Sequence, residues 1–246
     1  MFLSLKYENL KKLVRAKKVS SFKVEPIDTS ISLKERIYIS LKQAISSMNI
    51  YEDGVNLRLD ERKLSDQLET SRTPIREALA RLEQEGLVRI VPRKGVYIVR
   101  KNKSEILEMI TVWAALESMA ARLATQRATD QEIAALRAIF STFQDGQVQA
   151  HIDEYSAANI EFHQSIIDMS QCKLLKETAG NIFLHIRSIR SRTIADVDRA
   201  TRSIIDHIHI IEALENRNSD LAESLVRDHA LNLSNHVSEN VSYLDE

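Results

Sequence analysis

Apolar residues recur at helical spacing along most of this chain of 246 residues. The first stripe consists of Leu33, Ile37, Leu41 and Ile45. A second, short helix is expected at 60–68, where Asp60 provides an N-terminal cap. A third helix follows Ser71, which can cap it, and accommodates Pro74 in its first turn before Gly86 ends it. Three helices are therefore predicted between residues 32 and 86.

Two β-rich strings then interrupt the helical pattern. They are LVRIV at 87–91 and GVYIV at 95–99, joined by a Pro-Arg-Lys turn, and together they predict a β-hairpin. Three helices followed by a hairpin predict a winged helix-turn-helix. The remaining predicted elements are helices at 104–127, 130–144, 150–169, 173–193, 200–216 and 218–241. The expected fold class is mainly α, with an N-terminal winged helix-turn-helix followed by an all-α antiparallel helical bundle.

The same pattern predicts three segments. Residues 1–30 form a basic N-terminal extension with one candidate helix at 4–18. Residues 31–101 form the winged helix-turn-helix domain, and residues 102–246 form an all-helical domain for effector binding and dimerisation.

Charge is divided unevenly between these segments. Residues 1–103 hold 22 Lys and Arg against 13 Asp and Glu, whereas residues 104–246 hold 12 against 22. A basic N-terminal part indicates a polyanionic partner, and solvated surface charge is the alternative. The single cysteine, Cys172, excludes an internal disulfide, and no apolar run approaches the ~18 residues of a membrane span. The N-terminus also lacks a signal peptide's apolar core, so we expect a cytoplasmic protein without a membrane partner.

Side chains suited to reading DNA gather at the start of the third helix. Arg72 and Arg76 are four residues apart, so they share a helix face beside the apolar stripe. In a helix-turn-helix this helix enters the major groove, where arginine binds guanine through two hydrogen bonds. Ser71 and Thr73 can donate hydrogen bonds to phosphates. We therefore expect double-stranded DNA as the partner.

Two further elements extend this candidate surface. Arg62 opens the preceding helix and can reach the same groove. Arg93, Lys94 and Gly95 form a cationic turn whose glycine permits close approach to a sugar-phosphate backbone. A solvated basic face without DNA-binding function is the alternative.

The stretch LSDQLETSRTPIREALARLEQEGLVRIVPRKGVYIV (Leu64–Val99) closely resembles the DNA-binding signature of GntR-family bacterial transcription regulators. Its parts are S-R-T-P-x-R-E-A-L, then L-x-x-E-G-L, then a P-R-x-G wing. The resemblance implies a dimeric operator binder. It places the base- and backbone-reading positions at Arg62, Arg72, Thr73, Arg76 and the wing around Gly95.

The helical remainder resembles the FCD effector domain of the FadR subfamily, in its shorter, six-helix, VanR-like form. Three stretches carry this resemblance: WAALESMAARLATQRATDQEI (Trp113–Ile133), NIEFHQSI (Asn159–Ile166) and DHIHIIEALENRNSDLAESLVRDH (Asp206–His229). The family's first metal ligand is an aspartate, at the position of Asn159 in this chain. The uncharged amide should weaken metal binding.

Helical geometry independently turns three histidines toward the core. His163, His207 and His229 each fall on the apolar arc of a different predicted helix. Three buried imidazoles are costly unless they share a purpose. Together with an oxygen from Asn159 they suit a divalent Zn, Ni, Fe or Mn ion. The alternative is a polar pocket that reads an effector directly.

Candidate effector contacts lie on two helices. Trp113, where relatives often carry arginine, shares an apolar arc with Glu117. The predicted inward arc of helix 173–193 contains Leu174, Thr178, Ile182 and Ile189, together with His185 and Arg192. A small carboxylate metabolite is expected on the metal, steadied by Arg192 or His185, although either could instead pair structurally with Glu117.

The predicted function is a ligand-responsive, homodimeric, DNA-binding transcription regulator. One alternative is an architectural DNA-binding protein without an effector. Another is a metal-dependent hydrolase fused to a DNA-binding domain, but Glu161 lies on the wrong side of its helix from His163 to act as a general base. No Ser-His-Asp, Walker or Rossmann signature indicates an enzyme.

Overall fold

The computed structural model describes residues 32–141, 143, 152–196 and 199–245. The N-terminal extension at 1–30, with its predicted helix at 4–18, lies outside the described residues. So do the predicted end of helix 130–144 and the predicted start of helix 150–169. The part of the chain from Leu33 onward packs as one unit.

The first described elements form the predicted winged helix-turn-helix. They are α2 (Leu33–Ser47), β1 (Arg58–Leu59), α3 (Glu61–Gln67), α4 (Arg72–Gln84), β2 (Val88–Val91) and β3 (Gly95–Ile98). The apolar stripes of α2 and α4 meet in a core in which Ile75, Leu79 and Leu82 are fully buried. The hairpin is confirmed, and β1 adds a strand that the sequence did not reveal. The antiparallel sheet order is β1-β3-β2.

The predicted helix boundaries in this region rest on local hydrogen bonds. Asp60 caps α3, and its Oδ1 accepts hydrogen bonds from the backbone N–H groups of Arg62 and Lys63 at 2.8 and 3.2 Å. Ser71 occupies the N-cap position of α4 with extended backbone, but its side chain makes no capping hydrogen bond. Its hydroxyl is therefore not committed to the helix.

Six helices follow among the described residues. They are α5 (Lys103–Arg127), α6 (Asp130–Ile139), α7 (Ile152–Met169), α8 (Lys173–Thr193), α9 (Arg199–Glu215) and α10 (Ser219–Asn240). Asn102 with Glu105, and Thr129 with Glu132, form capping boxes that start α5 and α6. The predicted mainly α fold is confirmed, except that α6 ends at Ile139, five residues before the expected end.

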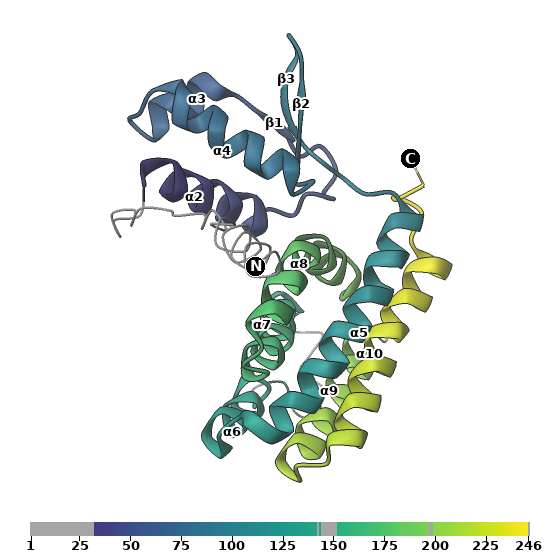
Figure 1. Cartoon of the computed structure of the whole chain (residues 1–246). Coiled ribbons are helices and arrows are strands. Elements are labelled where there is room, and N and C mark those ends of the chain that lie inside the picture. The colour runs from purple at the N-terminus through teal and green to yellow at the C-terminus, as the bar shows by residue number, and fades with distance from the viewer. Residues whose placement is uncertain (1–31, 142, 144–151, 197–198, 246) are drawn as a thin grey trace, which may run out of the picture. The chain divides into compact units, whose positions relative to one another are not determined.

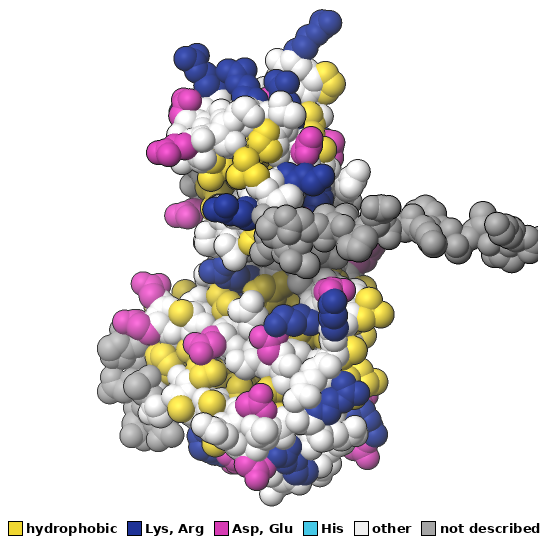
Figure 2. All heavy atoms as spheres, turned by 60° about the vertical axis from the view of Figure 1, so that its left-hand side comes forward, with side chains coloured by type: hydrophobic (Ala, Val, Ile, Leu, Met, Phe, Trp, Pro, Cys, Tyr) yellow, Lys and Arg dark blue, Asp and Glu magenta, His cyan; other side chains and the backbone are white. Residues whose placement is uncertain are grey.

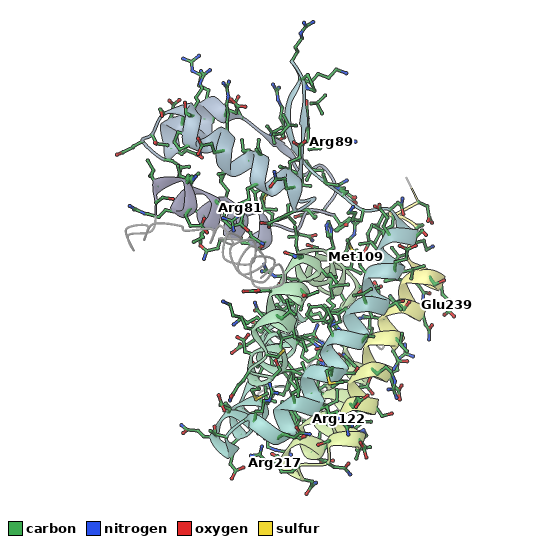
Figure 3. The ribbon with its side chains drawn as sticks, viewed as in Figure 1. Arg81, Arg89, Met109, Arg122, Arg217 and Glu239 are labelled. Atoms are coloured by element: carbon green, nitrogen blue, oxygen red, sulfur yellow. The ribbon has the colours of Figure 1, made fainter. Side chains whose placement is uncertain are left out.

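The helices α5 and α10 pack along most of their lengths, side by side (Figure 1). Arg122 of α5 reaches across this contact (Figure 3), where its Nη1 lies 2.6 Å from Asp220 Oδ1 and 2.8 Å from Glu223 Oε2. The helices α7 and α8 also pack on α5 and on each other. This arrangement brings one face each of α5, α7, α8, α9 and α10 into a shared interior. None of the described helices is long and apolar enough to cross a membrane.

Candidate DNA-binding face and candidate metal centre

The side chains predicted to read DNA are exposed at the winged helix-turn-helix. Figure 2 shows Lys and Arg side chains, in dark blue, gathered over this part of the chain. The exposed residues include Arg62, Ser71, Arg72, Thr73, Arg76, Arg93 and Lys94. Arg76 is the one with an ion pair, because its Nε lies 2.7 Å from Glu61 Oε2. That contact is exposed, so DNA phosphate or base groups can replace it at small cost.

The wing owes its shape to two residues with positive φ. Arg93 has φ +64° and Gly95 has φ +119°. A Cβ at Gly95 would also lie 3.3 Å from Arg58 Nε. Glycine therefore serves both the turn and the close approach of the neighbouring strand.

Two arginines beside the wing were missed from the sequence. Arg58 on β1 and Arg89 on β2 both pair in register with Tyr97 on β3, and both are exposed (Arg89 is labelled in Figure 3). Residues in register across neighbouring strands share a face. Arg58 and Arg89 therefore form a cationic face of the sheet. The two-residue strand β1 was too short to reveal this pairing.

Three histidines from three helices converge inside the helical region. His163 on α7, His207 on α9 and His229 on α10 each offer one ligand atom, and these atoms all lie within 4.8 Å of one another. Their side chains are buried, with 1%, 0% and 6% exposure. Asn159 is also buried, four residues before His163 on α7 and therefore on the same face of that helix. We call these three histidines together with Asn159 the histidine centre.

A second contact orients each imidazole. Nδ1 of His163 is hydrogen-bonded to Glu117, Nδ1 of His207 lies 3.3 Å from the Tyr155 hydroxyl, and Nδ1 of His229 lies 2.9 Å from Asp206 Oδ2. Each ring therefore turns Nε2 toward the interior. This is the arrangement of metal-binding histidines, whose second nitrogen is held by a carboxylate or other polar group.

Several buried atoms at the histidine centre have no hydrogen-bond partner within the described ranges of the chain. They are Nε2 of His163, Nε2 of His207, and both the oxygen and the nitrogen of the Asn159 side chain. Leaving buried polar atoms without hydrogen bonds costs about 1–3 kcal/mol each. An ion or ligand that binds here would satisfy them, so the donor set fits a metal with nitrogen and oxygen ligands.

Burial sets the charges in the centre. It lowers the pKa of His163 and His207 well below the usual value and that of His229 to about 4. The imidazoles are therefore neutral at pH 7, as metal ligation requires. Burial raises the pKa of Glu117 to about 7, against the opposing charge of Arg190.

Two of the predicted effector residues lie next to the histidine centre. Trp113 is 1% exposed and stacks on Phe183, and its Nε1 donates a hydrogen bond to Glu117 Oε2 at 2.6 Å. Glu117 is fully buried and holds His163 through its other oxygen. Glu117 thus positions a histidine, and Trp113 forms an apolar wall beside it.

The other two predicted effector residues lie elsewhere. Nδ1 of His185 is 2.8 Å from the Tyr51 hydroxyl, and Arg192 bonds the Tyr51 carbonyl and lies 3.2 Å from both carboxylate oxygens of Asp53. This placement corrects the predicted arc of α8, on which Leu174 is 73% exposed. The physical reason is that α8 packs against the helices on one side and against the loop around Tyr51 on another.

Arg190, and not Arg192 as expected, is the arginine of α8 that lies beside the histidine centre. Its side chain is 1% exposed, Nη1 lies 3.3 Å from His229 Nε2, and Nη2 lies 3.9 Å from Glu117 Oε2. A buried arginine gives no signal in a hydrophobicity pattern. Its neighbours Ile186, Ile189 and Thr193 do mark the buried face on which it lies.

A cavity of about 370 Å³ opens between α9 and α10, beside the histidine centre. Its lining includes Arg199, Ser203, Asp206, His229 and His236. His229 therefore has one face in the histidine centre and one in this cavity. We call it the rim cavity.

Two family models match the chain. One is described as Bacterial regulatory proteins, gntR family, and covers residues 33–98, and the FCD domain covers residues 108–232. The Nta operon transcriptional regulator of Aminobacter aminovorans is 36% identical over 174 residues, which are 70% of this chain and 80% of the relative. The chain belongs to the GntR family of bacterial transcription regulators.

Other relatives agree with this assignment. The HTH-type transcriptional repressor RspR of Escherichia coli is 24% identical over 179 residues, which are 73% of this chain and 78% of the relative. The structure of E. coli McbR/YncC has the same fold, with a TM-score of 0.69, 22% identity, and coverage of 86% of this chain and all of that one. This GntR regulator carries an FCD domain, as in the FadR subfamily, and is not an enzyme.

Proposed function

We propose that this regulator binds a pseudo-palindromic operator as a homodimer and responds to a small carboxylate metabolite in a metal-containing pocket. The observation that carries the proposal is the convergence of three neutral, buried imidazoles with an unpartnered amide. An architectural DNA binder without an effector would have no use for these unpaired groups. The proposed domains are residues 31–101 and 102–246, with 1–30 as a basic extension.

The proposed metal ligands are Nε2 of His163, His207 and His229, with the Asn159 side-chain oxygen. This set suits Zn, Ni, Fe or Mn. When bound, the metal supplies positive charge and open coordination positions for a carboxylate. Glu117, Tyr155 and Asp206 hold the three rings in the required orientation, and Arg190 lies where it can bind the ligand.

The proposed DNA contacts are those of the exposed winged helix-turn-helix. Arg72, Arg76 and Arg62 would reach base edges or phosphates in the major groove, with Ser71 and Thr73 on phosphates. Arg93, Lys94 and Gly95 would meet the flanking backbone. One recognition helix reads too few bases alone, which supports a dimer on two half-sites. A DNA-binding regulator works where its DNA is, so the proposed location is the cytoplasm.

Coupling between the two functions is proposed to pass along α5, which starts at Lys103, soon after β3, and carries Trp113 and Glu117. The contacts of His185 and Arg192 with Tyr51 give α8 a second route to the same region. A ligand shifts operator affinity only if it binds the two arrangements unequally, typically by about 1–3 kcal/mol. By analogy with relatives named repressors, the proposed direction is release from DNA.

The test is operator titration of the zinc-loaded protein with and without each member of a panel of small organic acids. We expect at least one acid to lower operator affinity in the wild type and to have no effect in His207→Ala. An acid that acts equally on both proteins would disprove the pocket as the regulatory site. Operator binding that no acid or metal alters would instead favour the architectural alternative.

A further inference from the structure

Two guanidinium groups, those of Arg190 and Arg199, lie beside the histidine centre, and each has at least one buried nitrogen without a hydrogen-bond partner among the described residues. We infer that the effector carries at least two acidic groups, one directed at the three histidines and one bound by Arg190 and Arg199. This inference rests on the proposed effector site and specifies the chemical class of its ligand.

Arg190 is a buried cation with unused hydrogen-bonding capacity. Its Nε and Nη2 have no hydrogen-bond partner in the part of the chain that the structure describes, and the Glu117 oxygen at 3.9 Å is too far away for a hydrogen bond. Its remaining contact is with the neutral ring of His229. A guanidinium is built to hold a carboxylate through two parallel hydrogen bonds, and burial strengthens that pairing.

Arg199 brings a second guanidinium to the same place. Its Nε is buried without a hydrogen-bond partner among the residues described, and Arg199 lines the rim cavity together with His229. His229 links the two arginines, because Arg190 contacts its Nε2 and Arg199 lines the same cavity. Burial and the charge of Arg190 lower the pKa of Arg199 itself to about 10, which leaves it cationic at pH 7.

Three of the carboxylates nearby already contact a histidine among the residues that the structure describes, and a fourth, Glu239, lines the rim cavity at an exposed position. Glu117 accepts from Trp113 and holds His163, and Asp206 holds His229. Asp196 acts on Arg199, but its Oδ2 lies 2.6 Å from His236 Nε2. Metal binding would add further positive charge to this site.

An anion with two separated acidic groups can bind both the histidine centre and the two guanidinium groups. One group can reach the histidine centre, while the other lies between the two guanidinium groups. The rim cavity, at about 370 Å³, falls in the size range of small-molecule sites. Arg199 and His229 line it, and the buried Arg190 contacts His229 Nε2 at 3.3 Å. A monoacid of equal length would leave the arginine nitrogens that no described residue binds without an acceptor.

The experiment is calorimetric titration of the full-length, zinc-loaded protein with matched acids. The pairs are malonate with propionate, succinate with butyrate, and glutarate with valerate, each differing by one terminal carboxylate. We expect the diacid of at least one pair to bind about tenfold or more tightly, the effect of one charge-assisted hydrogen bond. Arg190→Gln and Arg199→Gln should each reduce that ratio, and Arg192→Gln should preserve it.

The outcomes separate this inference from the proposed function. Equal affinity within every pair, or a ratio unchanged in both Arg190→Gln and Arg199→Gln, would overturn the two-acid site while leaving a carboxylate effector intact. If no acid binds the zinc-loaded protein, the carboxylate effector and this inference fail together. Arg190→Lys keeps the charge without the planar fork, and Arg199→Gln lies nearer the surface, so either remains informative if Arg190→Gln does not fold.

Discussion

The DNA-binding face and the histidine centre are built from opposite kinds of surface. The side chains of Arg72 and Lys94 are exposed and make no hydrogen bond or ion pair with the described residues, so their charge is presented to water. His207 and Asn159 are almost completely buried, and Nε2 of His207 and both polar atoms of the Asn159 side chain have no hydrogen-bond partner among the described residues. The first region is ready for a polyanion at any time. The second stays energetically incomplete until a ligand enters, which is the physical basis for expecting regulation there.

The largest expected effect is on metal binding, which should depend on the histidine centre and not on the DNA-binding face. His163→Ala, His207→Ala and His229→Ala should each abolish stoichiometric zinc binding, because a three-histidine site loses a ligand. Zinc at 100 times its Kd stabilises the wild type by about 2.7 kcal/mol, and this stabilisation should disappear. Metal analysis and thermal unfolding with and without zinc would measure both.

His209→Ala is the matched control, since His209 is exposed on the same helix as His207. It should retain metal and stabilisation in full. If zinc, nickel and manganese leave the melting temperature of the wild type unchanged, the proposed metal site is wrong.

The second prediction concerns pH, to which only the buried region should respond strongly. In metal-free protein the folded-state pKa values of His163, His207, His229 and His185 lie below the usual 6.5, with His185 and His229 at about 4. The unfolded chain therefore binds more protons between pH 6.5 and 4. The stability contributed by neutral histidines is complete above pH 6.5 and decreases as pH falls, by up to about 1.4 kcal/mol per histidine per pH unit.

Glu117 opposes this trend. Its pKa is raised to about 7, so its contribution weakens as pH rises from 4.5 to 7. Four histidines outweigh one carboxyl group, and the net expectation is a lower free energy of unfolding at pH 5 than at pH 7. Urea unfolding at the two pH values would measure it. A protein that is equally stable at both would show that the histidines are not buried as neutral groups.

The third prediction addresses the exposed region. Arg72→Ala should weaken operator binding by about 1–3 kcal/mol and relax base preference, because a bidentate contact with guanine is lost. Arg81→Ala is the control on the same helix. Arg81 stacks over the Tyr38 ring at 3.6 Å and pairs with Glu35, on the side of α4 that faces α2 (Figure 3). Fluorescence titration with operator and scrambled DNA would compare them, and equal losses in both variants would contradict the recognition-helix assignment.

These regions also differed in how far the sequence could predict them. The recognition helix was predictable because its signals are local: Asp60, Pro74 and Gly86 fix element boundaries, and Arg72 and Arg76 follow from spacing alone. The three histidines were predictable because each lies on the apolar arc of its own helix. Each of these predictions depends only on residues a few positions away in the sequence.

The sequence-based predictions failed where the position of a side chain depends on how two elements pack together. Helix α8 packs on two surfaces, so its apolar stripe did not tell that Arg190 turns inward while Arg192 reaches Asp53. Likewise, β1 is a strand only because β3 pairs with it, and its Arg58 was therefore missed. Rotation of a helix by 200° over two residues decides which arginine lies beside the histidine centre. Tertiary packing determines this orientation, and the local sequence does not indicate it.

The smallest expected effect tests how Asn159 tunes the histidine centre. Asn159→Asp replaces a neutral amide oxygen with a charged one at a buried position, beside three neutral imidazoles. A charged ligand should raise zinc affinity, by about tenfold or about 1.4 kcal/mol. Without metal, the same carboxylate is a buried charge without a committed partner, so the metal-free protein should be less stable than the wild type. The two effects have opposite signs, and thermal unfolding with and without zinc resolves them in one experiment.

The matched control is Asn232→Asp, which adds the same charge at an exposed position lining the rim cavity. It should change neither zinc affinity nor metal-free stability by more than a few tenths of a kcal/mol, since water screens its charge. If Asn159→Asp binds zinc no more tightly than the wild type, the amide does not ligate the metal. Asn159 would then be free to bind the effector itself, and the metal would rest on the three histidines alone.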